Sequence, residues 1–484
     1  MAREGGWAGL LGLAGAACRY VNSLILTRVL GSSAYGLFAL ANTVITLLQL
    51  PANMGLPMSA VHFVAGSAGT KRWANLRWII RAALRLVVVS SIVWAVLIVV
   101  TAPWTSGALF RKEGLFLPLA GLAAALPLLG IGAVCSGSLQ GLKLIRAKVF
   151  FERIAHPLVF SVLLVAGGLF FRSLGYVLVC FGIATAVVAF ACGGWLSRSL
   201  RQVPPAEGPV TLGWRELLRF STPVMFLNLL NYFILWSDVL IMGIFRPAAE
   251  VGVYHIASRL GVAVNMPTEA LNSSLAPNYS SLHSQGDMAG LNRTFHTSTR
   301  WILALSSLIC LVLVFGGRPL LRVFGPDFTA GYLALCLLAG GQLASAAMGT
   351  NGMLLTMTGY PHVNLVNAVI LGLANLGLNL VLVPRYGAAG AAAAAASSLA
   401  LVNVVRCAEI WVIFRTVPWD RTVLKPLGAL LVAGAAGGAA LLAAGPLPAA
   451  AVAPAVFVLV WWLAGPEAED LDLLRRARAR LSRG

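Results

Sequence analysis

The chain has 484 residues, of which 59% are hydrophobic and only 11% are charged, and its formal net charge is +19. Soluble globular domains carry about 25% charged residues, so this composition excludes a soluble globular protein and indicates an integral membrane protein. Apolar runs of about 20 residues recur along the chain, and each can cross a hydrocarbon core as a helix. Because the runs are too long for barrel strands, the sequence predicts an all-α polytopic membrane protein.

We predict fourteen transmembrane helices, and we read the first as a retained helix rather than a cleaved signal peptide. Proline lacks an N–H group, so Pro51 and Pro267 should kink the second and eighth spans. The predicted spans are 8–30, 34–64, 79–102, 115–139, 150–171, 174–198, 217–245, 252–280, 297–318, 330–356, 362–384, 387–413, 424–444 and 447–465.

The spans divide into two lobes and a tail. We expect an N-terminal lobe at 1–198, a cytoplasmic linker at 199–216, a C-terminal lobe at 217–415, and two last helices with a basic tail at 416–484. Since each lobe has six spans, both lobes enter the membrane in the same orientation and form a parallel repeat.

A gap-free alignment supports the repeat. Residues 34–51 align with 250–267 at an offset of 216, which sets Gly36 on Gly252 and Pro51 on Pro267. The same register pairs Asn22 with Asp238, two polar residues inside the first helix of each lobe.

Basic residues set the predicted orientation. Lys and Arg are roughly three times as frequent in segments that lie inside when both termini are cytoplasmic, which predicts that topology. The basic tail LLRRARARLSRG should contact anionic lipid rather than nucleic acid. The 7 cysteines lie singly and suit buried apolar positions rather than zinc sites or disulfides.

Several charged residues fall inside predicted spans, where an ion needs water or a partner. Arg19, Asp238 and Arg259 lie deepest, and they suit either a cavity or ion path, or structural ion pairs. Other charges lie close enough to an interface to anchor a helix by snorkelling. These are Arg28, Arg153, Arg406, Glu152 and Glu409.

The third span begins with a regular series of arginines. Arg77, Arg81 and Arg85 recur every four residues, so their side chains share one helix face. Two interpretations remain open: a cationic path that draws an anionic head group toward a cleft, and an anchor to the cytoplasmic surface.

Polar residues form a stripe on the second span. They follow helical spacing, whereas the leucines between them face elsewhere. The stripe is Asn42, Thr46, Gln49 and Asn53, and its counterpart in the eighth span is Ser258, Val262, Asn265 and Glu269, with Arg259 beside it. The two stripes suggest a hydrophilic cleft between the lobes, although hydrogen bonding between helices can produce the same pattern.

Residues 26–66, with the sequence LTRVLGSSAYGLFALANTVITLLQLPANMGLPMSAVHFVAG, resemble the start of the polysaccharide exporter branch of the MATE-like (MOP) superfamily. The run NLGLNLVLVPRYGAAGAAAAAASS at 375–398 and the loops LQGLK at 139–143 and MTGYP at 357–361 are also similar to that branch. The resemblance covers about 5–415, and the last two helices suit fourteen-helix members such as the sporulation stage V protein B group and the lipid II flippases.

The resemblance implies alternating access and the movement of undecaprenyl-pyrophosphate-linked sugars from the cytoplasmic to the outer leaflet of a bacterial plasma membrane. Lipid II flippases carry cavity arginines on their first, second and eighth helices. Arg19 and Arg259 are in keeping with the first and last of these, but the second span has no interior arginine. The substrate-binding residues that we predict are Arg19, Asn22, Gln49, Arg81, Arg85, Arg259 and Glu269.

Some relatives also hold a sodium ion in the second lobe. Asp238, Asn375 and Asn379 occupy similar places, with Asn where the family has Asp. Oxygen ligands suit a hard cation, but a site with one carboxylate is weaker. Alternatively, Asn375 and Asn379 bond neighbouring helices.

The leading function is therefore a flippase for a polyprenyl-pyrophosphate saccharide, acting as a monomer in membrane lipid. It needs no cofactor apart from possible coupling to Na⁺ or H⁺. A cation-coupled multidrug exporter is the alternative, but deep arginines outnumber deep acids, which favours anionic cargo. An enzyme such as a membrane glycosyltransferase would need paired carboxylates in a loop, and only the tail offers them.

Overall fold

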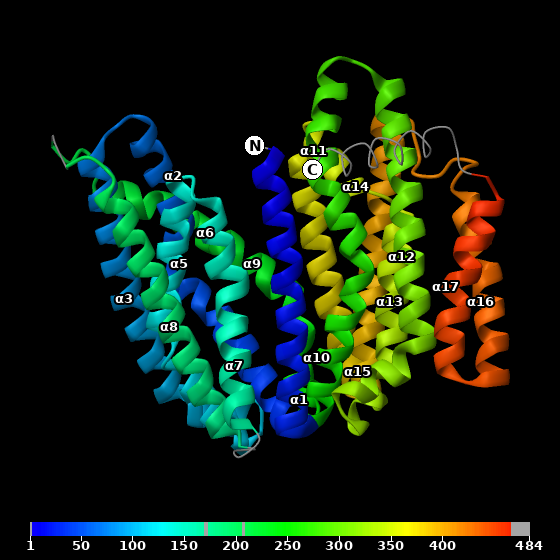
Figure 1. The fold of residues 1–484 in the computed structure, drawn as a ribbon, viewed down its shortest axis with the longest axis horizontal. Coiled ribbons are helices and arrows are strands. Elements are labelled where there is room, and N and C mark those ends of the chain that lie inside the picture. Colours follow the sequence, from blue (N-terminus) through cyan, green and yellow to red (C-terminus); the bar gives the residue numbers. More distant parts are fainter. Residues whose placement is uncertain (1, 169–172, 206–208, 466–484) are drawn as a thin grey trace. The chain divides into compact units, whose positions relative to one another are not determined.

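The computed structural model describes residues 2–168, 173–205 and 209–465, and the regular secondary structure in these ranges is helical (Figure 1). The chain forms two compact units, Met1–Gly252 and Val253–Gly484. The predicted all-α class is confirmed. The lobe boundaries at 198 and 217 and the linker between them stay a prediction. The predicted basic tail lies outside the described residues.

In its described residues, the first unit contains nine α-helices and the start of a tenth. They are α1 (Ala2–Asn53), α2 (Leu56–Gly69), α3 (Trp73–Trp104), α4 (Phe116–Ala123), α5 (Leu126–Gly141), α6 (Ile145–Val149), α7 (His156–Gly168), α8 (Leu174–Arg201), α9 (Trp214–Phe245) and α10 (Ala248–Gly261). A π-helical turn, Phe150–Ala155, joins α6 to α7.

Up to residue 465, the second unit takes the remainder of α10 and seven further α-helices. They are α11 (Met266–Ser284), α12 (Met288–Phe324), α13 (Tyr332–Ala347), α14 (Asn351–Met357), α15 (Pro361–Phe414), α16 (Leu424–Ala444) and α17 (Pro446–Leu463).

Many of these helices can cross a membrane. Among the described residues, 9 are long and apolar enough, or up to 11 when each of two bent pairs counts as one span. The two longest, α1 and α15, each contain a glycine with non-helical backbone angles, Gly31 (φ 73°) and Gly387 (φ 56°). Both glycines lie at predicted borders between spans. The protein is therefore a multi-pass membrane protein, and the count of fourteen stays a prediction.

The α-helix is interrupted at both sites where a kink was expected. After Pro51, α1 ends at Asn53, and Met54 (φ 49°) and Gly55 (φ 69°) adopt left-handed backbone angles before α2 begins. Gly55 is required there, because a Cβ atom would lie 2.2 Å from the carbonyl oxygen of Ser221 on α9. At the second site, a 3₁₀ turn, Val262–Asn265, precedes Pro267 at the start of α11.

The segment before α9 is attached to the start of α3. Asn75 exchanges two hydrogen bonds with Thr211, at 2.8 and 2.9 Å. Arg77 donates through Nη2 to the carbonyl oxygens of Val203 (3.1 Å) and Pro204 (3.2 Å). These contacts use the guanidinium of Arg77 for packing within the first unit.

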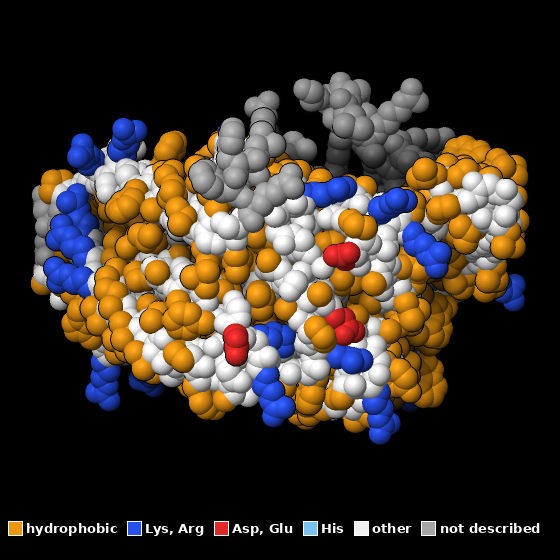
Figure 2. Space-filling model, turned by 90° about the horizontal axis from the view of Figure 1, so that it is seen from below, with side chains coloured by type: hydrophobic (Ala, Val, Ile, Leu, Met, Phe, Trp, Pro, Cys, Tyr) orange, Lys and Arg blue, Asp and Glu red, His pale blue; other side chains and the backbone are white. Residues whose placement is uncertain are grey.

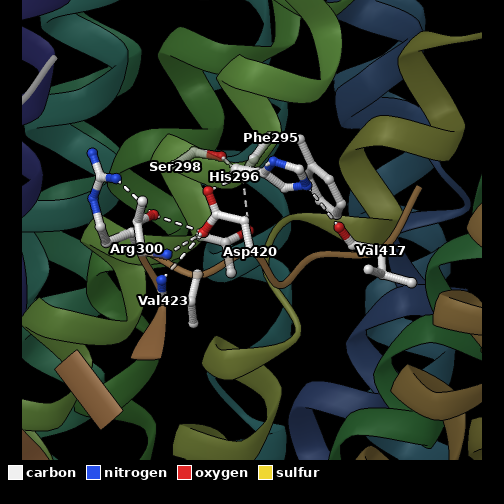
Figure 3. A network of polar contacts seen from close by, with 9 residues as sticks. Phe295, His296, Ser298, Arg300, Val417, Asp420 and Val423 are labelled. Carbon is white, nitrogen blue, oxygen red and sulfur yellow. Dashed lines mark hydrogen bonds and ion pairs between the residues drawn. The ribbon is translucent and has the colours of Figure 1, made fainter. Parts of the chain in front are cut away.

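In the second unit, α12 holds the loop that leads into α16 (Figure 3). The Asp420 carboxylate accepts hydrogen bonds from the Thr422 hydroxyl (2.6 Å) and from the backbone N–H groups of Thr422 (3.0 Å) and Val423 (3.2 Å). From α12, Arg300 donates to Thr422 (2.8 Å), and His296 donates through Nε2 to the carbonyl oxygen of Val417 (2.9 Å).

The surface suits a lipid environment. Figure 2 looks along the helices from one end, where apolar side chains lie among lysines and arginines and acidic side chains are few. The outer face of α3 is apolar, since Val89, Val93, Val96 and Val100 are all more than half exposed. Such a continuous apolar surface on a folded chain indicates contact with a membrane.

Candidate functional site

A cavity of about 590 Å³ lies inside the first unit. Its walls come from α1, α2, α5, α6, α7, α8, α9 and the π-helical turn, and its volume is typical of small-molecule sites. The polar lining residues are Arg19, Gln49, Asn53, Ser136, Gln140, Lys148, Glu152, His156, Thr185 and Asn228. The remaining wall is mostly apolar, with Met58, Val61, Leu128, Leu129, Val188 and Met225.

Three titratable residues line one side of the cavity at intervals of four. They are Lys148, Glu152 and His156, on the continuous stretch from α6 through the π-helical turn to α7. An α-helix has 3.6 residues per turn, so steps of four drift around it, and the wider π-helical turn offsets this drift. The π-helical turn therefore keeps all three side chains on the cavity wall.

Lys148 has two partners in the cavity. Its Nζ donates to the Gln140 side chain at 2.8 Å and lies 3.5 Å from the Glu152 carboxylate. The Lys148 side chain is 26% exposed and the Glu152 side chain 51% exposed. The cavity thus holds a lysine, its carboxylate counter-ion and an exposed arginine, Arg19.

The bonds around His156 fix its tautomer. The Thr185 hydroxyl donates its proton to the carbonyl oxygen of Phe181 (2.7 Å), so its oxygen accepts from Nε2 of His156 (3.1 Å). In neutral His156, Nδ1 is then a hydrogen-bond acceptor. The ring packs edge-on against Phe181, with centroids 5.0 Å apart.

The predicted site residues do not all reach the cavity. Arg19 and Gln49 line it, together with Asn53 from the predicted polar stripe. Asn22 is buried and fastens α1 to α7 instead, because it donates to the carbonyl oxygen of Pro157 (3.0 Å) and accepts from Ser161.

The other predicted binding residues lie elsewhere. Arg81 and Arg85 are exposed on α3 and are not among the lining residues. Arg259 is on α10 and Glu269 on α11, both in the second unit. Substrate contacts by these four residues stay predictions.

The predicted cation ligands lie in both units. Asp238, on α9 in the first unit, is 8% exposed, and one carboxylate oxygen accepts from the N–H of Val239 (2.7 Å). In the second unit, buried Asn379 donates to the carbonyl oxygen of Asn375 (2.9 Å) and also to its side-chain oxygen. A common site for the three residues stays a prediction.

Lys148 and His156 are the functional candidates that sequence reasoning missed. Lys148 precedes the predicted span 150–171, so we assigned it to a cytoplasmic loop. Glu152 was interpreted as an anchor at the membrane interface. The available signal was the spacing of Lys148, Glu152 and His156 at four-residue intervals, which is typical of one helix face.

Comparisons with known proteins give one protein family and two curated relatives. A profile of the family described as polysaccharide biosynthesis protein matches residues 1–283. The probable low-salt glycan biosynthesis flippase Agl15 of Haloferax volcanii is 26% identical over 397 residues, which are 81% of this chain and 79% of that protein. The probable flippase AglR of Haloferax volcanii is 26% identical over 188 residues, 38% of this chain and 39% of that protein.

Solved structures share the fold. The lipid II flippase MurJ, in an inward closed conformation, superposes with a TM-score of 0.70 and 14% identity over 94% of this chain and 97% of that chain. An inward-facing multidrug resistance MATE family transporter of the MOP superfamily superposes with a TM-score of 0.68 and 14% identity. The match covers 83% of this chain and 94% of that chain. At this identity the similarity concerns the fold alone.

Proposed function

Because the chain belongs to the polysaccharide biosynthesis protein family, we propose that it is a flippase for a lipid-linked saccharide. The two curated relatives mentioned above are described as probable flippases, and none of the relatives mentioned is described as an enzyme. The cargo that suits this chain is a polyprenyl-pyrophosphate saccharide, which passes from the cytoplasmic to the outer leaflet by alternating access.

The observation that carries the proposal is the charge balance of the cavity. Arg19 and Lys148 offer two cations, whereas Glu152 is the one carboxylate among the described lining residues and is paired with Lys148. Two cations on a largely apolar wall suit a phosphate-bearing head group attached to a lipid. Amide and hydroxyl groups such as Gln49, Asn53 and Asn228 suit the hydroxyls of a sugar.

A multidrug exporter remains the second candidate, because the MATE transporter has nearly the same TM-score as the flippase. A cavity for cationic drugs should hold unpaired acids, since an opposite charge stabilises a buried ion. The pairing of Glu152 with Lys148 therefore argues for an anionic cargo.

The distribution of lysine and arginine supports a location. We propose that the protein lies in the cytoplasmic membrane with both termini on the cytoplasmic side.

Reconstituted transport tests the function. Purified protein in liposomes should make a fluorescent polyprenyl-diphosphate saccharide, added to one leaflet, accessible to a quencher on the other side. Arg19→Gln should lower the initial rate by roughly tenfold or more, because a charge-assisted bond to phosphate is lost. Efflux of a cationic dye without any saccharide movement would support the exporter instead.

A further inference from the structure

The two partners of the Lys148 ammonium group lie at different distances from it. Gln140 accepts a hydrogen bond from Nζ at 2.8 Å, which is an ordinary hydrogen-bond length, whereas the Glu152 oxygen lies 3.5 Å away. Charge-assisted N–H···O bonds in proteins are usually about 2.7–2.9 Å long. Gln140 therefore positions the ammonium group, and Glu152 acts on it mainly through its charge.

The Glu152 carboxylate can move away from Lys148. Its side chain is about half exposed, and Lys148 is its ion-pair partner in the described chain. Glu152 also lies on the π-helical turn, a helix form that often occurs at functional sites. If the carboxylate rotated toward water in the cavity, Gln140 would still hold Lys148 in place.

An anionic head group and Glu152 compete for the same cation. The head group can bind Lys148 only when the carboxylate moves away, so its affinity is reduced by the free energy of the ion pair. When Glu152 returns to Lys148, it opposes renewed binding of the head group. A transport site must bind its cargo well enough to load it and weakly enough to release it.

We propose that Glu152 is an internal competitor that weakens binding of the substrate diphosphate at Lys148 and thereby speeds its release. This inference rests on the proposed flippase function and concerns the same cavity. Glu152 acts through Lys148 and is a positioning residue rather than a ligand of the substrate.

The chain offers a matched control. Arg246 and Glu250 form another ion pair with the same four-residue spacing and a similar distance of 3.6 Å, and neither residue lines the cavity. Glu250→Gln removes the same charge as Glu152→Gln. It should leave both binding and transport unchanged.

The test measures affinity and turnover separately, using full-length protein. The binding probe is a polyprenyl diphosphate without sugar, added to protein in nanodiscs of neutral lipid. Glu152→Gln should raise its affinity by about two- to fivefold, the range for a partly exposed ion pair, and should lower the maximal transport rate of the saccharide lipid. Glu152→Asp, which keeps the charge, should restore most of the transport rate.

A double-mutant cycle shows whether Glu152 acts through Lys148. Lys148→Gln alone should weaken binding, and adding Glu152→Gln to it should then change affinity little. An equal gain in both backgrounds, or no gain in Glu152→Gln, would overturn the inference while the flippase function stands. If the wild-type protein bound no polyprenyl diphosphate and moved no saccharide lipid, both proposals would fail.

Discussion

Gly36 and Gly252 lie in backbone contact within the first unit, and they are equivalent positions in the predicted 216-residue repeat. A Cβ atom on Gly36 would lie 1.7 Å from the carbonyl oxygen of Ala248, and one on Gly252 would lie 2.6 Å from that of Ser32. Ser32 and Ala248 are themselves equivalent in the repeat. The contact is therefore reciprocal, as expected where two repeats meet around a two-fold axis.

This contact predicts a strong effect of one methyl group. Gly36→Ala should destabilise the protein by at least about 2–3 kcal/mol, because neighbouring backbone cannot yield as a side chain does. Gly66→Ala is the control, since a Cβ atom at that helical position meets nothing within 4 Å. Thermal unfolding in detergent should show a large loss for Gly36→Ala and none for Gly66→Ala. Equal melting temperatures would show that the repeats do not pack this closely.

The sequence predicted the breaks in the helices more completely than it predicted the residues that line the cavity. Proline and glycine act locally, so the breaks after Pro51 and at Gly31 and Gly387 follow from residue type and position. The cavity brings together α1, α5 and α7, and no local pattern reports which helices converge. Arg19 and Gln49 were found because polar residues are rare in apolar spans.

The arginines of α3 also show that a local pattern does not reveal what a helix face contacts. Their four-residue spacing correctly places them on one face of a helix, but the sequence does not say what that face meets. In the structure Arg77 bonds the backbone before α9, and Arg81 and Arg85 are exposed. Lys148 was missed because a lysine near the end of a span suggests an ordinary loop charge.

His156 should contribute to transport through its unprotonated nitrogen. With Nε2–H donated to Thr185, Nδ1 can accept a hydrogen bond from a substrate hydroxyl. His156→Phe keeps an aromatic ring and removes the acceptor, so it should lower transport by roughly three- to tenfold, as expected for one neutral hydrogen bond. Thr185→Val, which frees the ring to rotate, should give a smaller loss. Unchanged transport in His156→Phe would leave His156 a packing residue.

The Asp420 network predicts a dependence of stability on pH. Burial alone would raise the pKa of Asp420, but hydrogen bonds from Thr422 and Val423 and the nearby His296 ring outweigh it, so the pKa lies below its usual 3.8. A carboxyl group with a lowered pKa stabilises the fold above its unfolded pKa, and the stabilisation is lost as pH falls through the folded pKa.

Asp420→Asn should therefore melt at a lower temperature than the wild type at neutral pH, and the difference should shrink toward zero as the pH falls below 3.8. The exposed Glu113 in the loop before α4 offers a control, because Glu113→Gln should change the melting temperature little at either pH. A difference that stayed constant down to low pH would exclude the charge of Asp420 as its cause.

The last prediction concerns coupling through Asp238, whose side chain is 8% exposed on α9. A buried carboxylate is costly unless it binds a cation, pairs with a basic group or takes up a proton. A ligand shifts a conformational equilibrium only through its different affinities for the two states, so a bound sodium ion or proton can drive the transport cycle. Asp238→Asn keeps the shape and should leave insertion and the melting temperature largely intact, while transport should lose any dependence on sodium or on pH. The measurement compares initial rates across sodium and pH gradients in liposomes, with potassium as the control ion. Rates that still respond to either gradient in the variant would leave Asp238 with a structural role only.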